Sequence, residues 1–224
     1  AVSCQGNLVV KEGITGKNCK IIASGDADIN FIEQGRLVAG GLVVVRRQSY
    51  YSDICAGDDI RCHNTSRIIG GRIIAGGSIS LGELGSTESR PSLLAAGIVA
   101  ERLDSLNQMK NSVLEQQEAI IRWQQQYRGK PHAKKIRKMK EKLKETKLKL
   151  LRINLIPGTG IYSRAAGPLE EEQFSGEDYR SDGGIAIEKI TIDVTGTIYA
   201  DTVIRIGNCL MKLEKNVSNR RFKL

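Results

Sequence analysis

A short phrase that recurs through the first hundred residues constrains this chain more than any other feature. Each copy places aliphatic residues before a small residue, and glycine follows in most copies. The small residues of successive copies are Cys4, Ala23, Ala39, Ala56 and Ala75, so the copies are spaced by 19, 16, 17 and 19 residues. This period is too short for a pair of helices. It fits one coil of a β-solenoid, whose strands stack about 4.8 Å apart on those of the next coil, and it predicts an all-β solenoid.

The pattern within each phrase indicates which side chains fill the solenoid. Aliphatic residues two positions apart point to the same side of a strand, and we expect Ile74 to point inward and to stack on its equivalents in adjacent coils. We expect alanine where little room remains, and glycine where a sharp corner needs a left-handed or otherwise strained backbone. Hairpin strands of a β-sandwich are the alternative, although such strands are usually spaced by about 8 to 12 residues.

Composition favours a thin aliphatic core. Aromatic residues make up 4% of the chain and hydrophobic residues 40%, whereas wide globular interiors usually recruit large rings. No apolar run approaches the roughly 20 residues that span a bilayer, so no transmembrane segment is predicted. The five cysteines are scattered and odd in number, which indicates a reducing compartment rather than a disulfide framework. Because the chain begins inside a repeat, we expect a fragment that lacks upstream sequence.

Residues 100–156 interrupt the repeat with a helical pattern. Of the 24 glycines, only Gly129 falls in this stretch. Heptad spacing predicts two helices of about 22 to 25 residues that pack together as a long antiparallel coiled-coil hairpin, and Pro157 is expected to end the second helix. The packed positions are Leu106, Met109, Val113, Gln116, Ile120, Trp123 and Tyr127 in the first helix, and Ile136, Met139, Leu143, Thr146, Leu150 and Ile153 in the second.

Strand-like sequence returns after the hairpin, so the hairpin is predicted to be an insertion whose exit lies near its entry. The returning strands are expected to stack on the coil formed by residues 73–97. Residues 163–183 carry six acidic residues and few apolar ones, which is typical of a solvated, partly disordered loop. The predicted organisation is β-helix coils at 1–99, the hairpin at 100–156, a partly acidic loop at 157–183, and returning strands with a C-terminal tail at 184–224.

The basic charge is concentrated in the second predicted helix. Residues 130–152 contain eleven basic and two acidic residues, a net charge of +9 that equals the formal net charge of the whole chain. One interpretation is a solvated coiled-coil face. The other is a docking site for an acidic protein surface, a nucleic-acid backbone or an anionic membrane surface. The candidate partner-binding residues are Lys134, Lys135, Arg137, Lys138, Lys142, Lys144 and Lys149.

The sequence predicts no catalytic, cofactor-binding or metal-binding residues. His63 and His132 belong to different elements. The spacing of Cys55, Cys62 and His63 matches no compact zinc-binding pattern, and a core or corner role for these cysteines is the better interpretation.

An ordered set of phrases resembles the flagellar assembly protein A family across nearly the whole chain. It comprises the phrase at 68–75, which reads Ile-Ile-Gly-Gly-Arg-Ile-Ile-Ala and runs into Leu84-Gly85-Ser86, the hairpin, and the C-terminal phrases at 196–199, 204–207 and 221–224. The resemblance implies a right-handed, single-stranded β-helix in the bacterial cytoplasm. It also implies a non-catalytic scaffold or adaptor role in flagellar assembly or its placement in the cell, without catalytic residues. The N-terminal domain of the family is absent from this sequence.

Three alternatives remain open at this point. A self-associating β-helix, similar to bactofilin filaments or to the β-helical half of the division inhibitor MinC, would stack through open ends, unless the hairpin and the polar tail at 216–223 cap one end. Non-specific nucleic-acid binding through the basic helix is the second alternative. Base-specific recognition has little support, because the nearby Trp123 and Tyr127 occupy packed positions. A hexapeptide-type acyltransferase, for which His63 is the only solenoid candidate for the catalytic histidine, is the third. The irregular spacing departs from the regular coil of about 18 residues in that class.

Overall fold

The computed structural model describes residues 1–88, 91–127, 133–158 and 189–223. They form two compact units. The first unit contains residues 1–100 and 155–158 together with the C-terminal strands, and the second contains two helices, α1 (Ala100–Gln126) and α2 (Ala133–Arg152). The turn predicted around Gly129 and the loop predicted at 163–183 lie outside the described residues.

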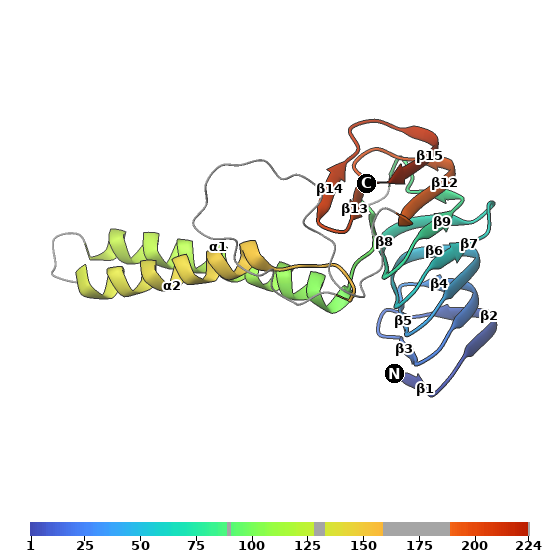
Figure 1. Cartoon of the computed structure of the whole chain (residues 1–224), viewed down its shortest axis with the longest axis horizontal. Coiled ribbons are helices and arrows are strands. Elements are labelled where there is room, and N and C mark those ends of the chain that lie inside the picture. Colours follow the sequence, from blue (N-terminus) through green and yellow to red (C-terminus); the bar gives the residue numbers. More distant parts are fainter. Residues whose placement is uncertain (89–90, 128–132, 159–188, 224) are drawn as a thin grey trace. The chain divides into compact units, whose positions relative to one another are not determined.

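Parallel strands stacked in columns build the first unit (Figure 1). The recurring phrase forms one column, in which each copy pairs with its equivalent in the next coil. Ile54, for example, is the register partner of Leu37 on one side and of Ile73 on the other. This first column comprises β1 (Val2–Cys4), β3 (Lys20–Ala23), β5 (Arg36–Ala39), the end of β6 (Val43–Ala56), the end of β8 (Arg67–Ala75), β11 (Leu93–Ala96) and β13 (Val203–Ile206).

Two further columns complete each coil. The second comprises the starts of β2 (Leu8–Thr15), β4 (Ala27–Glu33) and β6, followed by β7 (Ile60–Cys62), β9 (Ile79–Leu81) and β12 (Thr191–Ile198). The third comprises the ends of β2 and β4, the middle of β6, the start of β8, β10 (Glu83–Leu84) and the end of β12. All of these pairs are parallel, whereas hairpin strands pair antiparallel. The β-solenoid prediction is therefore confirmed, and the sandwich alternative is wrong.

Aliphatic side chains fill the interior of the solenoid. The interior cluster includes Ile54, Ile73, Ala75 and Leu94 from the first column. The predicted direction of Ile74 is wrong, because side chains alternate along a strand and Ile74 lies on the opposite side of β8 from Ile73 and Ala75. Ile74 is outside the interior cluster, but it is only 1% exposed. It is therefore buried on the outer side of the strand.

The corner glycines of the phrase make room for the preceding coil. A Cβ on Gly57 would overlap the carbonyl oxygen of Gly40, and a Cβ on Gly76 would overlap that of Gly57. None of these three glycines has a φ in the left-handed region. The expectation of a left-handed corner is therefore wrong for these three, although Gly6 and Gly97 of the first and last copies do have a positive φ. Close backbone approach between coils is the physical reason for glycine at the three.

A ladder of polar side chains joins the coils beside these glycines. Asn7 Oδ1 accepts a hydrogen bond from the backbone N–H of Asp26 at 2.9 Å, and Asp26 Oδ1 accepts one from the N–H of Leu42 at 2.8 Å. Asp59 Oδ1 repeats the contact with the N–H of Ser78 at 2.8 Å. Each of these side-chain oxygens lies where the Cβ of a glycine in the next coil would be. A side chain larger than that of glycine at these positions would displace the accepting oxygens and break these hydrogen bonds.

The chain leaves the solenoid at one of these corners. β8 ends at Ala75 and β9 begins at Ile79, so the usual corner there is three residues long. In the next coil β11 ends at Ala96, but the strand that follows this corner and stacks on β9 is β12, in which Ile192 is the register partner of Ile79. The corner therefore contains the whole stretch between Ala96 and β12. The parallel registers nevertheless continue, since β12 pairs with β9 and β13 pairs with β11. The returning strands thus stack on the coil of residues 73–97, as predicted.

Two antiparallel strands complete the first unit at its C-terminal side (Figure 1). β14 (Cys209–Lys212) pairs with β13, and β15 (Val217–Lys223) pairs with β12. They occupy the edges of the last parallel strands in the first column (β14) and in the second and third columns (β15). The tail predicted to cap one end of the solenoid is therefore a paired strand at that end.

We predict that Gly76→Ala destabilises the solenoid strongly. The new methyl group would overlap the carbonyl oxygen of Gly57, and such overpacking should lower the free energy of unfolding by about 3 kcal/mol. Gly6→Ala is the control, because a Cβ there meets nothing within 4 Å and only the positive φ is penalised, at about 1 kcal/mol. Denaturant unfolding of both variants provides the measurement. Equal losses would show that the coils do not approach as closely as described.

We also predict that the solenoid folds without the helices. A hydrogen bond connects the chain segments that lead into and out of the hairpin: the N–H of Val99 donates to the carbonyl of Leu155 at 2.9 Å. A short Gly/Ser linker in place of residues 103–151 should therefore leave the strand registers unchanged. Circular dichroism should lose its helical component while cooperative unfolding is retained. An insoluble or unfolded product would contradict the insertion.

Candidate partner-binding site

The two helices contact each other along the predicted heptad positions. Among these positions Val113 and Ile120 of α1 are buried, and the others are half-buried except Ile153, which lies just after α2 and is also buried. Gln116 and Thr146 are hydrogen-bonded at 3.4 Å, and the Lys135 ammonium lies 3.8 Å from the centre of the Trp123 ring. From Gln116 to Trp123 along α1, the contacted residue of α2 changes from Thr146 to the earlier Lys135. The helices therefore run in opposite directions where they touch.

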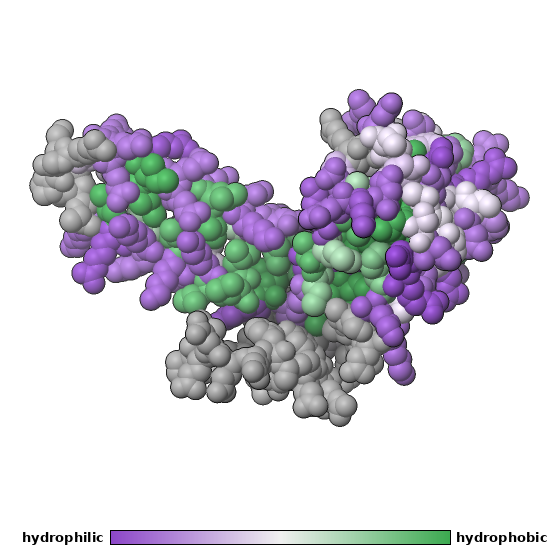
Figure 2. All heavy atoms as spheres, turned by 90° about the horizontal axis from the view of Figure 1, so that it is seen from above, coloured by the Kyte–Doolittle hydropathy of each residue, from purple (hydrophilic) through white to green (hydrophobic). Residues whose placement is uncertain are grey.

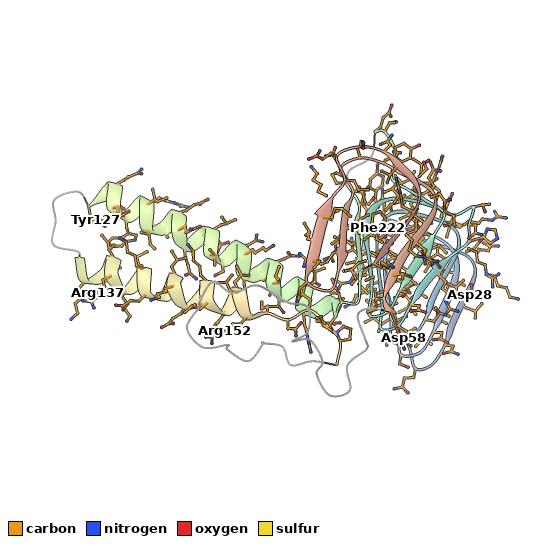
Figure 3. All side chains as sticks on the ribbon, turned by 45° about the horizontal axis from the view of Figure 1, so that its top comes forward. Asp28, Asp58, Tyr127, Arg137, Arg152 and Phe222 are labelled. Atoms are coloured by element: carbon orange, nitrogen blue, oxygen red, sulfur yellow. The ribbon has the colours of Figure 1, made fainter. Side chains whose placement is uncertain are left out.

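All seven candidate partner-binding residues are exposed on α2. Within the described residues Arg137 is the one member with an ion pair, 3.1 Å from Glu141 on the same helix. We call the basic side chains of α2 the basic row. Figure 3 labels Arg137 near the start of α2 and Arg152 at its end. Lys130, the first basic residue of the predicted run, lies outside the described residues.

The basic row is not explained by the stability of α2. The helix carries ten basic residues and two acidic ones. Pairs of like charge four residues apart, such as Lys134 with Lys138 and Lys140 with Lys144, each destabilise a helix by about 0.2 to 0.5 kcal/mol. Neutral polar residues would remove this repulsion and keep the helix soluble. An acidic ligand would relieve it, so the row is suited to binding an acidic surface.

The aromatic rings of α1 near the basic row already contact other side chains. Trp123 and Tyr127 stack on each other with their ring centres 4.4 Å apart, and the ammonium of Lys135 lies over Trp123. A nucleobase needs a free ring face for stacking. The pair therefore serves the contact between the helices, as the heptad spacing indicated.

The structure separates the residues considered for metal binding or catalysis. Cys55 lies at the end of β6 on its outer side, whereas Cys62 belongs to the interior cluster on β7. His63 Nδ1 lies 2.8 Å from the hydroxyl of Thr65 in the same loop. Across the part of the chain that the structure describes, no three His, Cys, Asp or Glu side chains are grouped to hold a metal ion. His132 lies outside that part.

Of the four exposed aliphatic residues on the described helices, three share a regularity that the heptad prediction did not include. Leu114 and Ile121 of α1 are 57% and 53% exposed, and Leu151 of α2 is 76% exposed. Each directly follows a packed heptad residue, and this regularity in the sequence was the available signal. Figure 2 shows hydrophobic surface among the hydrophilic side chains of the helical unit. Neither α1 nor α2 is long and apolar enough to cross a membrane.

Comparison with protein families places the chain in a described family. A family model described as the flagellar assembly protein A beta solenoid domain matches residues 1–224, the full length of this sequence. No curated protein and no solved structure matches the chain.

The burial of the cysteines predicts their reactivity. Burial raises the pKa of the Cys62 thiol to about 12, so the reactive thiolate is scarce near neutral pH, whereas Cys209 is exposed. We expect iodoacetamide to alkylate Cys209 quickly, and Cys62 only after denaturation. Mass spectrometry of the labelled peptides reports both rates. Comparable rates in the folded protein would contradict the inward position of Cys62.

Proposed function

Because this chain belongs to the flagellar assembly protein A family, whose role in flagellar assembly is not catalytic, we propose that it is a cytoplasmic scaffold or adaptor in bacterial flagellar assembly or its placement in the cell. The solenoid is the rigid body of the scaffold. The helices form a basic arm that captures a protein partner with an acidic surface through the seven residues named above. No step in this function requires a cofactor or a metal.

The proposal extends to the organisation of the chain. We assign the solenoid as a right-handed β-helix, the segment 100–156 as an antiparallel coiled-coil arm inserted into it, and the segments 157–183 and 184–224 as a connecting loop and the returning strands. The heptad burial and the opposite helix directions support the coiled coil. The pairing of β12 with β9 supports the insertion.

The observation that carries the proposal is the exposed charge of α2. The seven exposed basic residues named above, with one intrahelical ion pair among them in the described part of the chain, form a positive surface that can steer and hold an acidic partner. The occupied faces of Trp123 and Tyr127 favour a protein over a nucleic acid. The antiparallel strands β14 and β15 disfavour filament growth at the C-terminal end of the solenoid, because they occupy edges that another copy would use.

We predict that neutralising the arm impairs flagellar assembly. Lysine or arginine to glutamine at the seven sites removes seven positive charges and keeps a good helix former at each position. In the source bacterium this variant should reduce swimming in soft agar and the number of flagella seen by electron microscopy. The control variant changes seven exposed basic residues of the first unit to glutamine: Lys11, Lys17, Lys20, Arg47, Lys215, Arg220 and Lys223. Equal effects of the two variants would contradict a role for the arm.

A pull-down from the same cells separates the classes of partner. An acidic protein captured by the arm should be released by salt, because screening weakens exposed charge pairs, and added DNA should not compete. If DNA competes, and binding falls by orders of magnitude between about 50 and 200 mM salt, the ligand is a nucleic acid and the adaptor proposal fails.

A further inference from the structure

The two flanks of the helical pair differ in chemistry. In an antiparallel pair, residues that directly follow a packed residue lie on one flank in both helices, and residues that directly precede one lie on the other. Leu114 and Ile121 follow the buried Val113 and Ile120. They are seven residues apart, so they lie on one stripe of α1, and both are more than half exposed. This flank therefore presents two aliphatic side chains to solvent.

Basic residues of α2 line the same flank. Arg137, Lys140, Lys144 and Lys147 each directly follow a packed residue, and all four are exposed. A shallow hollow in the surface of α2 is lined by Ile136, Arg137, Lys140, Glu141 and Lys144. We call the surface formed by Leu114, Ile121, Arg137, Lys140, Lys144 and Lys147 the Leu114 flank. Leu151, which is 76% exposed, follows the packed Leu150 and lies on the same side at the end of α2.

The antiparallel directions of the helices determine which part of α2 lies beside Leu114 and which part lies beside Ile121. The Gln116–Thr146 and Trp123–Lys135 contacts place Ile121 beside the first half of α2 and Leu114 beside its second half. Each aliphatic residue is thus accompanied by basic residues of the facing helix.

The opposite flank lacks this combination. It carries Lys138, Lys142 and Lys149, but it also carries Glu115 and Glu145, and its α1 residues include Ala119 and no large aliphatic side chain. Leu148, which is 41% exposed, precedes no packed residue and follows none, so it points away from both flanks. Charge alone does not distinguish the flanks, whereas charge together with exposed aliphatic anchors does.

We propose that the Leu114 flank binds an acidic amphipathic helix of the partner protein, laid along the pair as a third helix; this rests on the proposed function of the arm. The anchors are one heptad apart, about 10.5 Å along the helix, which matches apolar residues spaced by seven in a partner helix. The basic row complements carboxylates beside those residues.

Two other occupants fit less well. An anionic bilayer needs a broad continuous apolar face, but Gln117 and Gln124 interrupt the stripe formed by Leu114 and Ile121. A second copy of this chain would set one basic row against another.

The test uses the whole chain and a synthetic helical peptide of about three heptads with leucine at the packed positions and glutamate beside them. Fluorescence anisotropy should show that Leu114→Ser with Ile121→Ser weakens binding at least about tenfold, while Leu148→Ser leaves it unchanged. Lys140→Glu, Lys144→Glu and Lys147→Glu together should weaken binding more than the matched set Lys138→Glu, Lys142→Glu and Lys149→Glu. Circular dichroism confirms that every variant remains helical.

Each contrary result overturns the inference. Equal loss from the two charge-reversal sets, with no effect of the serine changes, would mean attraction by diffuse charge. The Leu114 flank would then lose its role, while the proposed function of the basic arm would stand. A control peptide has the same composition but scrambled leucine positions. If it binds equally tightly, attraction by diffuse charge is again the explanation. Binding to vesicles of phosphatidylserine and phosphatidylcholine that depends on Leu114 and Ile121, without binding to the peptide, would assign the flank to a bilayer.

Discussion

Close contact between the corner backbones of successive coils is the constraint on which the rest of this structure depends. Where Gly57 lies against the carbonyl of Gly40, and Gly76 against that of Gly57, the coils are held at the distance that parallel strand pairing needs. The polar ladder through Asp26 and Asp59 then satisfies backbone N–H groups that the corners would otherwise leave without a strand partner. The aliphatic interior stacks in register because these corners do.

A solenoid held together in this way tolerates an insertion at a corner. Each coil is joined to the next by strand registers, so the chain between two columns can be long provided that it returns to the right partner. Residues between Ala96 and Ile192 satisfy this condition, since β12 and β13 resume the pairing begun by β9 and β11. Neither α1 nor α2 contributes a residue to the aliphatic interior that stabilises the first unit.

The proposed function assigns binding and stability to different positions of the helical pair. Its packed positions follow ordinary heptad logic, whereas its exposed positions do not serve folding. Like charges along α2 repel one another, and Leu114 and Ile121 leave aliphatic surface in water. The exposed aliphatic residues of α1 lie on one flank, where basic residues of α2 also lie, and this arrangement is expected where a partner covers them.

The sequence by itself determined the coil period, the position of the helical interruption and the packed residues of the helices, because periodicity is a local property that a single chain displays. It also located the basic row on α2. Only the tertiary structure decided that Ile73 rather than Ile74 faces the interior, because both residues are aliphatic and buried, so alternation in the sequence gives no phase. Only the tertiary structure assigned the glycines at 40, 57 and 76 to contact between coils, since the atoms that a Cβ would meet belong to residues 16 to 19 positions earlier. The flank that combines Leu114 with Lys144 likewise depends on the pairing of two helices, which brings together side chains that are far apart in the chain.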